Sequence, residues 1–186
     1  MTPLHETLRT TTRALHERAE GAFARFDLAR RDGYSEFLQA QGAALMPLEA
    51  ALDAAGAERL IADWPSRKRG AALAADLTAL GLLRLTPQPQ PQLAGDDEAF
   101  GALYVLEGSK LGARYLLARV SGSDFAQGAT AFLGHGEAPE RKDAWPVFLQ
   151  KLAAIPFEPA RAAALLAGAT AAFHLFERAA LAFEKA

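Results

Sequence analysis

The sequence contains no cysteine among its 186 residues. This absence excludes disulfide bonds, cysteine-ligated metal sites and thiol nucleophiles. β-Branched residues are scarce, and no alternating apolar and polar run bounded by turns predicts a strand. The net charge is only −2, with both signs spread along the chain. Because no stripe of basic residues stands out, we expect no nucleic-acid partner.

Long apolar segments are missing as well. No stretch of 18 apolar residues is available to span a membrane. The first residues, Met-Thr-Pro-Leu-His-Glu, lack the basic region and apolar run of a signal peptide. We therefore expect a cytoplasmic protein without a membrane partner.

Alanine and leucine dominate a composition that is 51% apolar, which favours helices. The length predicts one domain spanning residues 1–186, and the periodicity predicts a compact all-α bundle of seven or eight helices. We expect helices over about residues 4–26, 34–55, 58–63, 66–80, 96–120, 124–133, 141–154 and 159–186. Proline should kink the second helix at Pro47, end the third at Trp64-Pro65 and interrupt the seventh near Pro146. Residues 86–92 alternate proline and glutamine, which predicts an extended connection.

The stretch from Phe100 to Arg119 reads as one helix with two glycines in its interior, Gly108 and Gly112. Four residues apart, they share one face. Each costs roughly 1 kcal/mol relative to alanine in a helix interior. Two explanations are open: a close crossing with another helix, or a flat ligand lying against bare backbone. The stretch alone favours neither.

The four histidines are His5, His16, His135 and His174. No two stand in the spacing of a structural zinc site. We expect His5 to lie in a frayed terminus, His135 in an exposed loop, and His174 at the edge of the core. His16 differs because Glu20 follows it by one helical turn.

A carboxylate that accepts the Nδ1 proton of His16 would leave Nε2 free as an axial ligand and raise its basicity. The same two residues also fit an ordinary surface pair at i, i+4. Arg9, two turns earlier, is on the same broad face. There it can meet an anionic group of a ligand held by His16, or it can be solvated.

Two segments taken together resemble the haem oxygenase family, most closely the bacterial branch often found beside bacteriophytochromes. The first is residues 8–20, Leu-Arg-Thr-Thr-Thr-Arg-Ala-Leu-His-Glu-Arg-Ala-Glu, and the second is residues 104–113, Tyr-Val-Leu-Glu-Gly-Ser-Lys-Leu-Gly-Ala. The family pattern has Leu-Arg, a threonine, then histidine and a glutamate four residues later. Its distal helix carries a Leu-Glu-Gly-Ser-x-Leu-Gly-Gly-like run in this branch. Order, spacing and the helical remainder agree with the family.

The resemblance implies a haem-oxygenase-like fold in which haem, both substrate and cofactor, lies between two helices. His16 matches the proximal ligand of the iron, and Glu20 matches the carboxylate that orients it. Gly108 and Gly112 match distal glycines, whose missing side chains let the backbone approach the haem and dioxygen. Further haem-binding positions suggested by this resemblance are Arg9 and Tyr104 for the propionates, Thr12, Ala113 and Arg178.

The distal motif departs from the family at some positions. Ala113 replaces the second glycine of the usual pair, and its methyl group would lie against the haem. Ser109, which we group with Gly108 and Gly112 as catalytic, stands where many haem oxygenases have an aspartate that holds a water network. Lys110 is bulky and charged, and at helical spacing it points away from the haem.

The implied chemistry is oxidative opening of the porphyrin to biliverdin, carbon monoxide and ferrous iron. Haem supplies the difficult chemistry, and a neutral histidine fits it because a thiolate ligand would favour O–O cleavage. The implied partners are dioxygen, an electron donor such as ferredoxin, a flavin reductase or ascorbate, and a bacteriophytochrome as bilin acceptor. Iron release is the alternative purpose.

Two other functions fit the sequence. The first is a haem carrier or sensor without turnover, which Ala113 leaves open. The second is a helical protein that shares the fold and binds another small molecule, as thiaminase-like relatives do. If the protein is a haem oxygenase or a haem carrier, we expect His16 to bind the iron. If it binds another small molecule, we expect no such ligation.

Overall fold

A computed structural model of the chain describes residues 2–82 and 85–183. The described residues contain α-helices, 3-10 helices and connections, but no strand, so the all-α prediction is confirmed. The α-helices are α1 (Pro3–Thr11), α2 (Arg13–Phe23), α3 (Arg31–Ala54), α4 (Ala57–Leu60), α5 (Trp64–Arg67), α6 (Gly70–Ala79), α7 (Asp96–Val120), α8 (Ala131–Gly134), α9 (Ala144–Ala154) and α10 (Pro159–Leu181). The 3-10 helices are η1 (Asp124–Ala126), η2 (His135–Glu137) and η3 (Pro139–Arg141).

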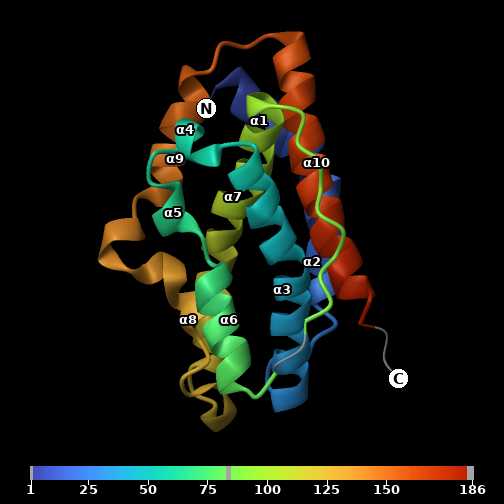
Figure 1. Cartoon of the computed structure of the whole chain (residues 1–186), viewed down its shortest axis with the longest axis vertical. Helices are drawn as coiled ribbons and strands as arrows, with labels where there is room; N and C mark the ends of the chain where they lie inside the picture. Colours follow the sequence, from blue (N-terminus) through green and yellow to red (C-terminus); the bar gives the residue numbers. More distant parts are fainter. Residues whose placement is uncertain (1, 83–84, 184–186) are drawn as a thin grey trace.

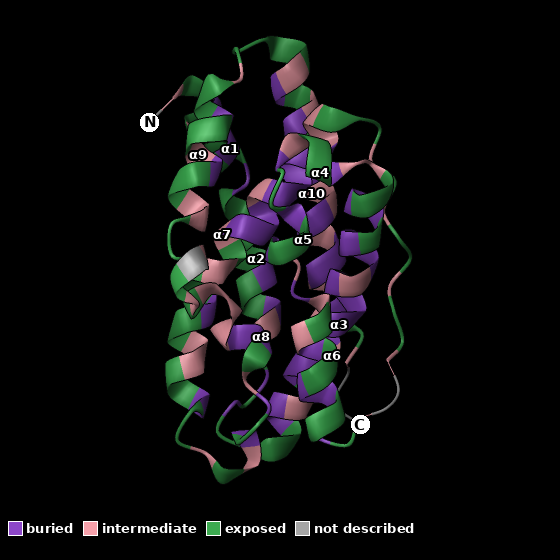
Figure 2. Cartoon of the chain, turned by 60° about the vertical axis from the view of Figure 1, so that its left-hand side comes forward, coloured by how far each residue is buried: buried purple, intermediate pink, exposed green. Residues whose placement is uncertain are grey.

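Helix α10 is the common support of the bundle, because α7, α2 and α3 all pack against it. Figure 1 shows α10 running along one side of the molecule, with α3 and α6 side by side and α7 behind them. Buried residues, most of them apolar, fill the space between these helices, and exposed residues lie outside (Figure 2). The functional residues described below come from α1, α2 and α7, all of which pack against α10.

Two glycines allow α7 and α10 to cross closely. A Cβ atom at Gly101 of α7 would overlap the carbonyl oxygen of Leu165, and one at Gly168 of α10 would overlap that of Glu98. Backbone therefore meets backbone at this crossing, and any larger residue would force the helices apart. This contact fixes the N-terminal half of α7.

Helix α3 continues through Pro47 without interruption. Proline has no N–H, so the carbonyl of Ala43 loses its usual partner within the helix. The N–H of Gln88 donates to that carbonyl at 2.8 Å. The proline thus leaves a free carbonyl that binds the connecting segment 85–94 to α3. This segment has no helix or strand, as expected.

Proline explains most of the wrong helix boundaries. Pro65 and Pro146 lie in the first turns of α5 and α9, where a missing N–H costs nothing. Hence Trp64-Pro65 begins a short helix where the sequence predicted an end, and the helix expected from residue 141 begins at Ala144. The helix expected from residue 66 begins at Gly70 instead, because the backbone is extended at Lys68.

Other boundaries differ for local reasons. The first predicted helix is divided into α1 and α2 at Thr12, whose buried hydroxyl donates to the Leu8 carbonyl at 2.8 Å. Such back-bonding bends helices. The helix expected over 124–133 is the separate η1 and α8. The last helix ends at Leu181, and the predicted extension to residues 184–186 lies outside the described part of the chain.

Candidate functional site

His16 lies on α2 with its imidazole largely exposed, the side chain showing 57% of its surface. Its Nδ1 atom is 3.5 Å from a carboxylate oxygen of Glu20, as the one-turn spacing predicted. Phe173 of α10 meets the imidazole edge-on, with ring centroids 5.8 Å apart. A carboxylate at Nδ1 favours the tautomer in which Nε2 is free to bind a metal.

Gly108 and Gly112 of α7 do not lie at a helix crossing. A Cβ atom at Gly112 would have no neighbour within 4 Å, and one at Gly108 would meet only the Trp145 ring, at 3.7 Å. Close packing of α7 against α10 is the role of Gly101 instead. The first explanation for Gly108 and Gly112 therefore fails, and a flat ligand against bare backbone remains.

The same face of α7 carries large apolar groups. Tyr104, Leu111 and Tyr115 share it with both glycines, since the five positions recur at helical spacing. Leu111 is 61% exposed and Tyr115 is 68% exposed. Tyr104 contacts the His5 ring of α1 at a centroid distance of 6.0 Å, so this face is turned toward α1. An exposed apolar strip of this kind is typical of a binding surface.

A small polar group lies where α1 meets α7. Arg9 is close enough to act electrostatically on both Tyr104 and His5. Burial, and then the charge of Arg9, lower the pKa of His5. Burial raises the pKa of Tyr104, and the charge of Arg9 opposes that rise. The structure thus brings the two predicted propionate contacts together and adds His5 to them.

The prediction of a frayed terminus at His5 was wrong. The residue lies within α1, where its N–H donates to the capping hydroxyl of Thr2 at 3.4 Å. Its ring also contacts Trp145 of α9 at 6.3 Å. The Trp145 ring also lies beside the Tyr104 ring, with centroids 5.6 Å apart, and stacks on the Phe148 ring, with centroids 5.7 Å apart. This aromatic wall was missed, because nothing in the sequence relates residue 145 to residue 5 or 104.

Three predicted haem-binding residues lie outside this group. Thr12 is buried at the α1–α2 break. The Ala113 side chain is 7% exposed and packs in the core, so its methyl group is not on the exposed glycine face. Arg178 is exposed in the last turn of α10, and within residues 2–82 and 85–183 no hydrogen bond or ion pair joins it to α2 or α7.

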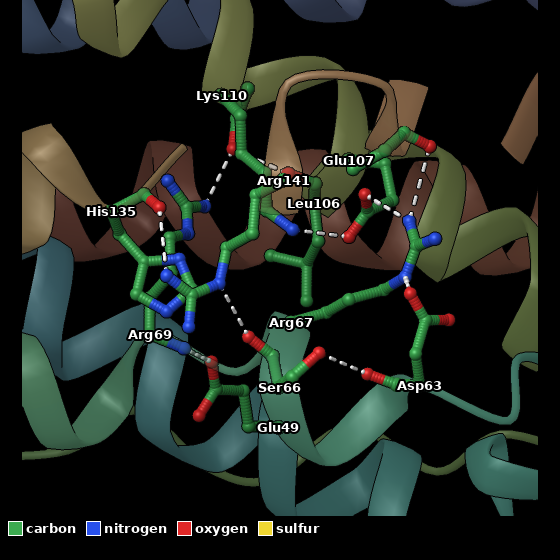
Figure 3. Close-up of polar contacts among 12 residues, drawn as sticks. Glu49, Asp63, Ser66, Arg67, Arg69, Leu106, Glu107, Lys110, His135 and Arg141 are labelled. Carbon is green, nitrogen blue, oxygen red and sulfur yellow. Dashed lines mark hydrogen bonds and ion pairs between the residues drawn. The ribbon is translucent and has the colours of Figure 1, made fainter. Parts of the chain in front are cut away.

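Behind Gly108, α7 is tied to a buried ionic cluster (Figure 3). Glu107, only 1% exposed, accepts from Arg67 at 2.7 Å and from Lys110. Lys110 therefore points away from the glycine face, in agreement with its predicted direction. Burial lowers the pKa of Lys110. Arg67 is 3% exposed and also pairs with Asp63 at 2.9 Å.

A second contact, a hydrogen bond from Arg69, holds Ser109, the residue that follows Gly108. The Arg69 guanidinium donates to the Ser109 hydroxyl at 2.6 Å, and that hydroxyl donates to the Leu106 carbonyl at 2.8 Å. Burial lowers the pKa of Arg69 to about 10, so the side chain stays charged at neutral pH. Glu49 of α3 accepts the Arg69 backbone N–H at 2.6 Å.

His135 lies beside this cluster and is only partly exposed (Figure 3). It belongs to η2, and its carbonyl accepts from Arg141 at 3.4 Å. The expected exposed loop at this position was therefore wrong.

Comparison with known proteins shows the family and the fold of the chain. The family model described as Heme oxygenase matches residues 2–181. The chain belongs to the haem oxygenase family. A solved structure, the NO- and CO-bound haem oxygenase from Neisseria meningitidis, superposes with a TM-score of 0.78 over 95% of this chain and 89% of that one. The two sequences are 23% identical, so this likeness shows the fold alone. No curated protein sequence matches the chain.

Membership of this family supports haem as the group that the protein binds. It favours a haem protein over the thiaminase-like alternative, because the matched region contains both His16 and the two glycines. Within the part of the chain that the structure describes, no helix is long and apolar enough to cross a membrane.

Proposed function

We propose that the protein is a haem oxygenase that opens haem to biliverdin, carbon monoxide and ferrous iron, with His16 as the iron ligand. The observation that carries the proposal is the bare backbone at Gly112. A glycine there costs α7 roughly 1 kcal/mol, and no atom of the described residues lies within 4 Å of the position that a Cβ atom would take. A flat substrate lying on this backbone gives the glycine a use.

The residues present fit haem. Haem, when bound, supplies the redox chemistry and the ring that is opened. Glu20 would hold the His16 ring by its Nδ1 proton, and Gly108 and Gly112 would admit the flat ring. Leu111 and Tyr115 would exclude water from its apolar edge. Arg9, with Tyr104 and His5, would hold the propionates, because a cation and two side-chain donors match carboxylates.

The purpose and partners proposed for the enzyme follow its chemistry. Electrons would come from a ferredoxin, a flavin reductase or ascorbate, and the reaction would take place in the cytoplasm. Supply of biliverdin to a bacteriophytochrome is the proposed purpose, and iron release is the alternative.

A haem carrier or sensor is the second candidate. It is favoured by Ser109, whose single hydroxyl hydrogen is already donated to the Leu106 carbonyl. This hydroxyl can accept one more hydrogen bond but has none to donate, unlike a residue free to order water on both sides.

Titration of the purified protein with hemin tests the proposal. We expect a sharp Soret band that saturates at one haem per chain. Addition of ascorbate in air should then replace this band with the broad red absorption of a bilin. A Soret band that persists, also with ferredoxin and its reductase, would establish the carrier or sensor. Absence of a saturable Soret band would exclude both haem functions.

The propionate contacts can be tested separately. We expect Arg9→Gln and Tyr104→Phe each to weaken hemin binding by roughly threefold to tenfold, since a charge-assisted contact at a partly exposed site is lost. Neither change should affect binding of hemin dimethyl ester, whose propionates carry no charge. Arg13→Gln is the matched control, because Arg13 is exposed on α2, where it pairs with Glu17 at 2.9 Å. Equal losses for hemin and its ester would contradict the assignment.

A further inference from the structure

Two arginines of one short segment, residues 67–69, bind α7 on both sides of Gly108. Arg67 holds Glu107, the residue before the glycine, at 2.7 Å. Arg69 holds Ser109, the residue after it, at 2.6 Å. Arg67 is the last residue of α5 and Arg69 lies in the turn that joins α5 to α6, beneath the helix in Figure 3. The cluster thus acts at the point on α7 where bare backbone begins.

These ion pairs and hydrogen bonds carry a large desolvation cost for a contact that only holds two helices together. Both arginines are 3% exposed and Glu107 is 1% exposed, so each charge has been removed from water. Apolar residues of similar size would often hold two helices together at no loss of stability. Charged groups add directional geometry, because a guanidinium presents its donors in a fixed plane.

In front of α7 at this level, the group that a Cβ atom at Gly108 would meet is the Trp145 ring of α9, at 3.7 Å. A Cβ atom at Gly112 would meet no atom of the described residues within 4 Å, and Leu111 and Tyr115 are exposed. The crossing with α10 is two turns earlier, at Gly101. The side-chain hydrogen bonds that hold α7 on either side of Gly108 come from behind the helix, at Glu107 and Ser109.

Arg69 is itself fixed from three directions. Its backbone N–H is held by Glu49 of α3. Its guanidinium lies over the Phe132 ring of α8, 4.9 Å from the centroid, and reaches Ser109 of α7. The Ser109 hydroxyl passes this constraint to the Leu106 carbonyl within the same turn of α7. Movement of Gly108 would have to break this chain of contacts.

We infer that Arg69, acting through Ser109, is a positioning residue that fixes the α7 backbone at Gly108 over the haem. This inference rests on the proposed function. The fixed backbone limits the orientations open to a diatomic ligand beneath it, and so restricts oxidation to one meso carbon. Arg69 touches neither the haem nor the reacting atoms in this assignment.

The test compares Arg69→Met, Ser109→Ala and the double variant with the wild-type protein, all loaded with haem. Hemin affinity should change by less than about threefold, because no proposed haem contact is removed. The C–O stretching band of the ferrous carbon monoxide complex should be single and narrow in the wild type and split or broadened in each variant. One biliverdin isomer in the wild type should become a mixture.

Two further variants separate positioning from general loss of structure. Arg69→Lys keeps a charged donor that can reach the Ser109 hydroxyl, and it should retain the single C–O band. Arg161→Gln is the matched control, because it removes an ion pair to α7 far from Gly108. Arg161 of α10 pairs with Asp97, in the first turn of α7, at 3.3 Å. This variant should change neither the C–O band nor the isomer pattern. The double variant should be no worse than Arg69→Met alone, since both changes interrupt one path.

An unchanged C–O band and isomer pattern in Arg69→Met and Ser109→Ala would overturn the inference. A change in Arg69→Met without one in Ser109→Ala would overturn the route through Ser109. If the wild-type protein binds haem but forms no bilin, the proposed function fails, whereas the C–O band still tests the positioning role.

Discussion

The variant His16→Ala is expected to lose the Soret band of histidine-ligated haem. His16 is the only histidine of α2, and its Nδ1 atom is already engaged by Glu20 at 3.5 Å, which leaves Nε2 for the iron. Loss of a residue that merely orients a metal ligand costs about 10–100-fold in metal affinity. Loss of the ligand itself should therefore weaken hemin binding by more than roughly 100-fold, as measured by Soret titration.

Three controls define the result. Glu20→Gln keeps the ligand and should weaken binding only about tenfold, since an amide still accepts the Nδ1 proton. His174→Ala, which removes a half-buried histidine of α10, should leave the Soret band in place. Free imidazole added to His16→Ala should restore a six- or five-coordinate histidine-like spectrum by entering the vacated space. An unchanged spectrum in His16→Ala without imidazole would show that another residue binds the iron.

The parts of the site that follow helical periodicity could be predicted from the sequence. His16 and Glu20 are one turn apart, and so are Gly108 and Gly112, so a helix places each pair on one face wherever it packs. The all-α fold follows from the composition and from apolar spacing in the same way. These are local properties, and they do not depend on how the helices are arranged.

The parts that depend on helix arrangement could not be predicted. Arg69 and Ser109 are forty residues apart, and only the fold brings the turn before α6 to α7. The meeting of His5 with Trp145 requires α1 to lie beside α9. The two explanations for Gly108 and Gly112 also stayed open until the space around them was known. The sequence pattern of a packing glycine and of a binding glycine is the same.

Alanine substitution at two glycines of α7 is expected to have opposite effects on stability. Gly101→Ala should lower the free energy of unfolding by about 3 kcal/mol or more, because the added methyl group overlaps the backbone carbonyl of Leu165 and the α7–α10 crossing must open. Gly112→Ala should instead raise it by roughly 0.5–1 kcal/mol in the haem-free protein, because alanine is the better helix former and the methyl group meets no atom within 4 Å. Urea unfolding of both variants measures the difference.

Haem binding then distinguishes the second variant from a simple stabilisation. The methyl group of Gly112→Ala would occupy the space proposed for the haem ring, so we expect hemin affinity to fall by roughly tenfold or more although the haem-free protein is more stable. Such an opposition between stability and binding is the mark of a residue kept for function. Unchanged hemin affinity in Gly112→Ala would place the haem elsewhere on the molecule. A loss of stability in the haem-free variant would mean that Gly112 is required for packing after all, and the main support for the haem site would be removed.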